Sequence, residues 1–104
     1  MHEEVKEILA EIDAMFEKKN GQYREGTDDL ANFTKGALLK YGDATMSERY
    51  EVLKDYVLKH ISHVYNHPLT GPKVDESLMD IAVYFVIALV MHRRLQHQIG
   101  VSRK

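Results

Sequence analysis

The chain has 104 residues and a mass of 12.0 kDa, which is the size of one small domain. With 14 Lys and Arg against 16 Asp and Glu, its formal charge of -2 supplies no positive field for wrapping nucleic acid. The sequence contains no cysteine, which excludes a disulfide scaffold, thiolate zinc sites and cysteine catalysis.

The first half of the chain has two segments with the apolar spacing of a helix face. The stripe from Val5 to Phe16 predicts a helix over residues 2–19, ended by the turn-forming pair Asn20-Gly21. A polar loop should follow, and then a short helix over residues 28–40. Gly42 is expected to close this second helix, because glycine tolerates the left-handed conformation of a helix end.

A third helix is predicted over residues 46–66. Thr45 and Glu48 have the spacing of a capping box, in which each side chain bonds the backbone N–H of the other residue. Pro68 cannot continue the helix and disfavours helical backbone in the residue before it.

The fourth helix is predicted over residues 76–99, with Asp75 as its cap and Gly100 as its stop. Its segment Ile81–Met91 is apolar all round, although a membrane span needs about 20 such residues. Because three other short helices cannot cover it on every side, part of this segment is expected to face another subunit.

Four helices with short links predict a single all-α domain over residues 1–104, arranged as a four-helix bundle and assembled as a dimer or tetramer. The opening residues are charged and helical, without the apolar core of a signal peptide. We therefore expect a cytoplasmic protein with no membrane contact and no strong nucleic-acid partner.

Two helices carry a pair of carboxylates four residues apart, which places both on one helix face. The pairs are Glu51 with Asp55 and Glu76 with Asp80. If the faces meet, the four groups would bind a hard divalent cation such as Mg²⁺. The alternative is that they are ordinary solvated helix residues, which is the stronger interpretation for the first pair. Asp80 lies at the mouth of the apolar segment, where an unpaired carboxylate is costly.

Three histidines lie near the end of the third helix, at His60, His63 and His67. Three imidazoles can ligate zinc, but Pro68 disturbs the third position, and histidines on helix surfaces are commoner than ligands. A contact from His63 to a phosphate or a base is the preferred functional interpretation.

The segment after the first helix combines cations, an amide and an aromatic ring. Such a mixture suits an anionic nucleotide, since a ring can stack on a base while cations meet phosphate. An equally good alternative is a solvated turn. The residues concerned are Lys19, Asn20, Tyr23 and Arg24.

Four motifs in order resemble a known family: Lys19-Asn20-x-x-Tyr23, Asn32-Phe33, the segment 58–66 and the segment 76–84. Over residues 15–92 the chain resembles the nucleotide-modification-associated domain common in phages. That group is similar in outline to the all-α MazG-like nucleoside triphosphate pyrophosphatases. The last motif, a carboxylate pair followed by Asp-Ile-Ala-x-Tyr, is the most specific part.

The resemblance implies a MazG-like bundle that hydrolyses nucleoside triphosphates with Mg²⁺. Glu76 and Asp80 would be catalytic and would hold the metal together with Glu51 or Asp55. Phosphates would meet cations and the base or sugar would meet polar side chains. The binding residues so implied are Lys19, Asn20, Tyr23, Arg24, Asn32, Lys59 and His63.

The third helix departs from the family, because Lys59-His60 stands where an Asp-Lys pair is usual. This loss of an acid favours an alternative: a non-catalytic phage module that binds a nucleotide, a modified nucleotide or a host protein. A further alternative is a purely structural helical oligomer.

Overall fold

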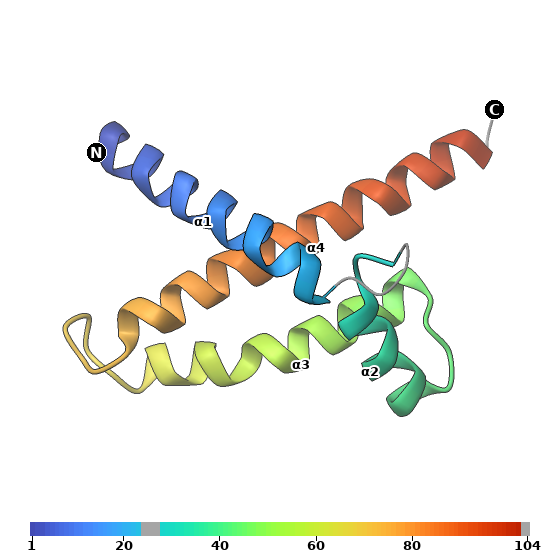
Figure 1. The fold of residues 1–104 in the computed structure, drawn as a ribbon. Helices are drawn as coiled ribbons and strands as arrows, with labels where there is room; N and C mark the ends of the chain where they lie inside the picture. Colours follow the sequence, from blue (N-terminus) through green and yellow to red (C-terminus); the bar gives the residue numbers. More distant parts are fainter. Residues whose placement is uncertain (24–27, 103–104) are drawn as a thin grey trace.

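The computed structural model describes the backbone of residues 1–23 and 28–102, and the side chains of 1–18 and 28–100. Within these residues there are four helices and no extended strand, which confirms the predicted all-α class. The helices are α1 (His2–Tyr23), α2 (Ala31–Tyr41), α3 (Met46–Tyr65) and α4 (Val74–Ser102) (Figure 1).

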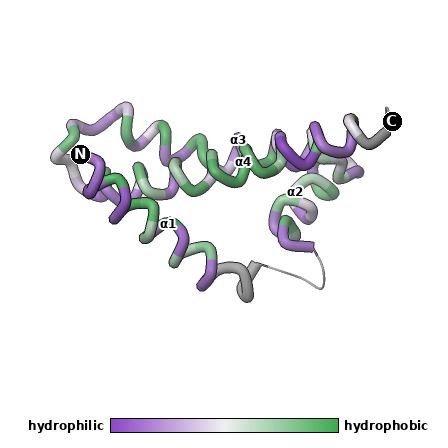
Figure 2. The backbone as a smooth tube through the Cα atoms, turned by 90° about the horizontal axis from the view of Figure 1, so that it is seen from above, coloured by the Kyte–Doolittle hydropathy of each residue, from purple (hydrophilic) through white to green (hydrophobic). Residues whose placement is uncertain are grey.

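The long helices α3 and α4 run antiparallel and form the largest interface in the molecule (Figure 1). The shorter α2 packs on α3 near its beginning. In the view of Figure 1, α1 passes in front of the middle of α4. The N-terminal half of α1 points away from the C-terminal end of α4. The structure is therefore an α3–α4 hairpin with α2 packed on α3, whereas most of α1 stands apart from the hairpin (Figure 2).

The capping box that begins α3 is present as predicted. The backbone N–H of Glu48 donates to Thr45 Oγ1 at 3.2 Å, and the N–H of Thr45 donates to the Glu48 carboxylate at 3.1 Å. Two of the N–H groups that a helix start leaves without intrahelical partners are thus satisfied.

α2 begins three residues later than predicted, at Ala31. The carboxylate of Asp28 accepts bonds from the Leu30 N–H at 2.9 Å and the Thr34 hydroxyl at 2.7 Å, and these bonds hold residues 28–30 as a turn. The predicted end is confirmed, since Gly42 has a φ of 74° and its N–H donates to the Leu38 carbonyl.

α4 is longer at both ends than the sequence predicts. Lys73 adopts a φ of 59° and its carbonyl accepts from the Ser77 N–H, so the helix starts at Val74 and Asp75 lies inside its first turn. Gly100 does not stop α4. A Cβ atom at position 100 would meet nothing within 4 Å, so no packed neighbour forces the backbone to leave the helix there.

α1 also continues past its predicted end and reaches Tyr23. A glycine inside a helix costs only about 1 kcal/mol relative to alanine, which the neighbouring helical residues offset. The prediction that Asn20-Gly21 ends the helix was therefore wrong.

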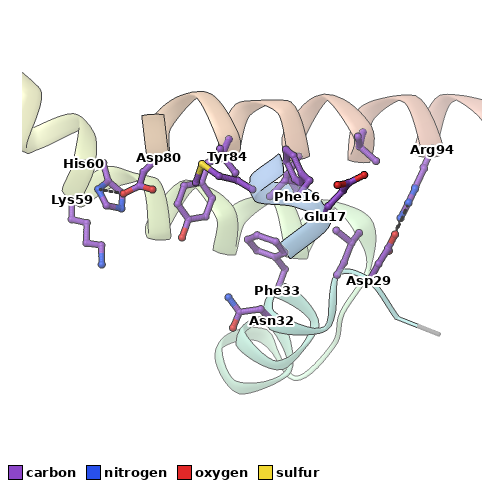
Figure 3. Close-up of a pocket in the computed structure, with 15 residues that line it drawn as sticks. Phe16, Glu17, Asp29, Asn32, Phe33, Lys59, His60, Asp80, Tyr84 and Arg94 are labelled. Carbon is purple, nitrogen blue, oxygen red and sulfur yellow. Dashed lines mark hydrogen bonds and ion pairs between the residues drawn. The ribbon is translucent and has the colours of Figure 1, made fainter. Parts of the chain in front are cut away.

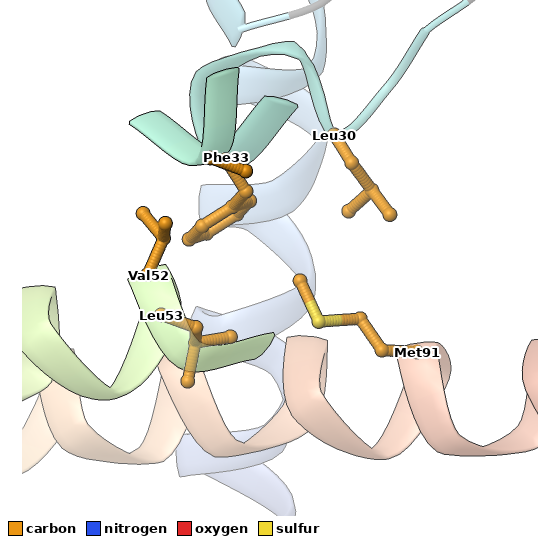
Figure 4. Packing of buried hydrophobic residues seen from close by; sticks show 6 residues of the cluster. Leu30, Phe33, Val52, Leu53 and Met91 are labelled. Atoms are coloured by element: carbon orange, nitrogen blue, oxygen red, sulfur yellow. The ribbon is translucent and has the colours of Figure 1, made fainter. Parts of the chain in front are cut away.

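The buried core lies where α2, α3 and α4 meet (Figure 4). Gly36 permits this close packing, because a Cβ atom there would lie 2.8 Å from Val52 Cγ1 and 2.6 Å from the Tyr56 hydroxyl. The core cluster comprises Leu30, Phe33, Ala37, Val52, Leu53 and Met91.

Among the described residues, no helix is long and apolar enough to cross a membrane.

Leu53→Ala should lower the free energy of unfolding by about 2–5 kcal/mol, because it leaves a cavity at a fully buried position. Urea denaturation at a fixed protein concentration measures the change. Leu39→Ala is the matched control, since Leu39 is 89% exposed, and its effect should stay within about 0.5 kcal/mol. Equal effects of the two substitutions would contradict the packing.

Thr45→Ala should lower the free energy of unfolding by about 1 kcal/mol, because it removes the side-chain acceptor of the α3 cap. Thermal denaturation of this variant is compared with that of Thr70→Ala, which changes an exposed threonine between α3 and α4. A loss no greater than that of the control would show that the cap contributes nothing.

Candidate functional site

A groove of about 610 Å³ opens between α1, α2, α3 and α4 (Figure 3). Its size falls in the range of roughly 300–1,000 Å³ that is usual for small-molecule sites. Every helix contributes, so the groove exists only in the folded chain. The lining residues are Met15, Phe16, Glu17, Asp29, Leu30, Asn32, Phe33, Lys59, His60, Asp80, Val83, Tyr84, Ile87, Val90 and Arg94.

Aromatic rings form the middle of the groove. Phe33 and Tyr84 meet edge to face, with ring centroids 6.4 Å apart and planes at 78°. The His60 ring continues the row, 6.1 Å from that of Tyr84. Figure 3 shows Phe16 beside this row. Such a surface can take the face or edge of a flat ligand ring.

One end of the groove carries a cation and a histidine–carboxylate pair. His60 Nδ1 lies 3.5 Å from the Asp80 carboxylate, and both side chains are partly buried. Lys59 is exposed beside them and makes no ion pair with any side chain in the described part of the chain. Its ammonium group can therefore meet an anionic ligand group without first breaking an ion pair.

The opposite end is closed by an ion pair between α4 and the turn before α2. Two guanidinium nitrogens of Arg94 donate to the two oxygens of Asp29, each at 2.9 Å. This bidentate bond raises the pKa of Arg94. The ion pair joins α4 to the turn before α2 at this end of the groove. The Arg94 N–H groups that donate to Asp29 are therefore not available to a ligand.

The four carboxylates expected to share a metal ion do not form one group. Glu51 pairs with Lys54 on its own helix, and Asp55 pairs with Lys40 of α2, both at 2.5 Å. Both contacts raise the pKa of the lysine concerned. Of the four, Asp80 alone lines the groove, and Glu76 is exposed outside its lining.

The residues present do not fit the expected Mg²⁺ site. Mg²⁺ needs oxygen ligands in near-ideal octahedral geometry. Within residues 1–18 and 28–100, no group of three or more His, Asp or Glu side chains is placed to hold a metal ion. Because Asp80 faces His60 and the α3 carboxylates face lysines, one described chain does not assemble the donor set.

Two of the predicted binding residues, Asn32 and Lys59, line the groove. His63 does not, because it lies in the last turn of α3, where its Nε2 is 2.7 Å from the carbonyl oxygen of Pro72 in the following loop.

The considered zinc triad is not formed either. His67 stacks on His63 with ring centroids 4.0 Å apart, and its Nδ1 is 2.7 Å from the His63 carbonyl. The in-plane nitrogens of stacked rings lie alongside one another and do not converge on one ion. The His60 ring faces Asp80 and not these two histidines.

Four predicted binding residues lie outside the described side chains: Lys19, Asn20, Tyr23 and Arg24.

Several groove residues were not singled out as site residues from the sequence. Phe16 and Phe33 belong to helical stripes and look like ordinary core residues. Arg94 and Asp29 are 65 residues apart, so nothing local relates them. Tyr84 had a usable signal, because it belongs to the motif segment 76–84, whereas His60 was predicted only as a candidate zinc ligand.

The chain matches no family model, no curated protein and no solved structure in comparisons with known proteins. The resemblance to the phage nucleotide-modification-associated domain therefore stays a prediction from the motifs.

Because the donor set is not assembled, millimolar Mg²⁺ alone should leave the Tm of the protein unchanged. A cation present at 100 times its Kd would add about 2.7 kcal/mol, a shift of several degrees in a domain of this size. Differential scanning fluorimetry with Mg²⁺ and with NaCl at matched ionic strength makes the measurement. A Mg²⁺-specific rise that disappears in Glu76→Gln or Asp80→Asn would contradict this expectation.

Proposed function

We propose that the protein binds a nucleotide in the groove between its four helices and does so without hydrolysing it. The observation that carries the proposal is an aromatic groove with, at one end, a lysine that makes no ion pair among the described side chains. This combination offers a stacking surface for a base and a cation for a phosphate in one site.

The base is assigned to the middle of the groove. Phe16, Phe33 and Tyr84 present rings and edges there, and Asn32 adds an amide on the α2 side. An amide offers both a donor and an acceptor, which suits the edge of a base or a sugar hydroxyl. Apolar walls from Val83 and Ile87 exclude water on the α4 side.

The phosphate is assigned to the end at Lys59 and His60. The two ends differ, because Arg94 is held by both oxygens of Asp29 whereas Lys59 has no ion-pair partner among the described side chains. Asp80 faces His60, so its negative charge is directed at the imidazole.

The charge of the lining favours a ligand with few phosphates. Three carboxylates line the groove (Glu17, Asp29 and Asp80) against the two permanent cations Lys59 and Arg94. A triphosphate without a metal ion would bring several negative charges to a site with no net positive charge. A nucleoside monophosphate brings at most two, and Lys59 is placed to meet them.

Hydrolysis is the weaker form of the proposal. The carboxylates expected to bind Mg²⁺ do not come together among the described side chains. The His60–Asp80 pair can orient one imidazole nitrogen, which is sufficient for a ligand contact. Binding without turnover therefore agrees best with the side chains in the groove.

Isothermal titration calorimetry with nucleosides, nucleoside monophosphates and nucleoside triphosphates, in the absence of Mg²⁺, tests the proposal. We expect a monophosphate to bind more tightly than the corresponding nucleoside or triphosphate. Lys59→Ala should weaken the binding of the monophosphate about tenfold or more, since it removes a charge-assisted contact. It should leave the affinity for the nucleoside nearly unchanged.

Lys54→Ala is the matched control, because Lys54 lies on the same helix outside the groove and pairs with Glu51. Its affinity for the monophosphate should equal that of the wild type. Equal losses in both lysine variants, or binding of no nucleotide at all, would contradict the proposal. Release of pyrophosphate from a triphosphate at enzymatic rates would contradict the non-catalytic form.

A further inference from the structure

Two helices leave apolar side chains uncovered. On α1 the exposed residues Val5, Ile8 and Leu9 continue the stripe that buries Ile12. On α4, four of the apolar residues between Phe85 and Val90 are 38–47% exposed. Figure 2 shows the hydrophobic colour continuing through the middle of α4, where the helix lies at the edge of the molecule. Exposed apolar surface of this extent marks a contact site.

The chain also has more surface than a compact monomer of its mass. Its accessible surface is 7780 Å², whereas folded monomers of 12.0 kDa expose about 6,000 Å². Its radius of gyration is 15.7 Å, against about 13 Å for a compact domain of this length. The excess of roughly 1,800 Å² per chain is as large as the area that each partner hides in an extensive homodimer interface.

The acidic first part of α1 and the C-terminal part of α4 carry opposite charge. Residues 2–18 of α1 contain six carboxylates and two lysines, and Glu4 and Glu11 flank Ile8 at helical spacing. After Asp80, by contrast, α4 contains no carboxylate, and Arg93 lies four residues beyond Leu89. The acidic apolar face of α1 and the basic apolar segment of α4 after Asp80 complement each other between two copies.

α4 also offers a place for a helix to dock. Leu89 and His92 border a second groove of about 430 Å³, which Tyr50 of α3 closes on the other side. Anchors spaced at i, i+3 and i+4, as in Val5, Ile8 and Leu9, are the usual means by which a helix fills an apolar groove.

From these observations we infer that two copies of this chain form a symmetric dimer, in which α1 of each copy packs on the C-terminal half of α4 of the other. Leu9 and Ile8 meet the apolar residues around Leu89, and the carboxylates of α1 lie beside Arg93. A two-fold axis repeats the contact, so both uncovered helices are buried in each copy. The anionic face of α1 excludes an acidic lipid surface as the occupant.

The oligomeric state gives the first test. Sedimentation equilibrium of the wild-type chain in the micromolar range should give twice the chain mass of 12.0 kDa. Leu9→Glu and Leu89→Glu should each weaken the dimer at least about 100-fold, because a symmetric interface contains every substitution twice. Leu39→Glu, at an exposed position on α2, is the matched control and should leave the dimer intact.

Charge reversal tests the pairing of the helices. Glu4→Lys with Glu11→Lys should weaken the dimer at least about tenfold, and Arg93→Glu added to the same chain should restore part of the loss. Circular dichroism of every variant checks that the helical content is unchanged. Hydrogen exchange tests whether α1 lies in the interface. Backbone amides in the first half of α1 should lose protection when the wild type is diluted and the dimer dissociates.

A wild-type chain that stays monomeric throughout this concentration range would overturn the inference. A dimer that survives both Leu9→Glu and Leu89→Glu would overturn its assignment to these helices. Failure of the nucleotide titrations has no bearing on either result, because the substituted residues Leu9 and Leu89 do not line the groove that contains Lys59.

Discussion

Leu53 and Met91 are buried together with Phe33 where α2, α3 and α4 meet, and the rest of the structure depends on this contact. It sets the position of α2 against the α3–α4 hairpin and therefore the distance across the groove. Phe33 belongs to both, since its ring packs in the core and also meets Tyr84 in the groove. A change that loosens the core would for this reason also alter the aromatic surface on which we place a base.

The same packing separates the carboxylates. Residues four apart on one helix share a face, so the sequence predicts that the two carboxylates of each pair point the same way. Whether the faces of two helices meet depends on the rotation of α3 against α4. Here the α3 pair is directed at Lys40 and Lys54, while Asp80 faces His60. The ammonium groups neutralise the carboxylates that a metal ion would otherwise have to neutralise. Among the described side chains, these carboxylates therefore do not come together as the expected metal centre.

The extended shape has a physical cause in the size of the chain. The other three helices lie on the core side of α4, and the described residues contain no further element that covers the opposite side or the first half of α1. The exposed residues on both helices are apolar, and their charged neighbours have opposite signs. In the dimer that we infer, a second copy would cover both surfaces through one two-fold operation.

The sequence by itself determined the helical class, the approximate position of four helices, the capping box at Thr45 and the end of α2 at Gly42. These features depend on residues a few positions apart, whose spacing is visible in the chain. Only the tertiary structure decided that α1 and α4 continue through their glycines, that Asp29 meets Arg94, and that Asp80 meets His60 rather than Asp55. The ion pairs join residues that are distant in sequence, and their partners depend on the rotation and register of packed helices, which a periodic apolar pattern leaves open.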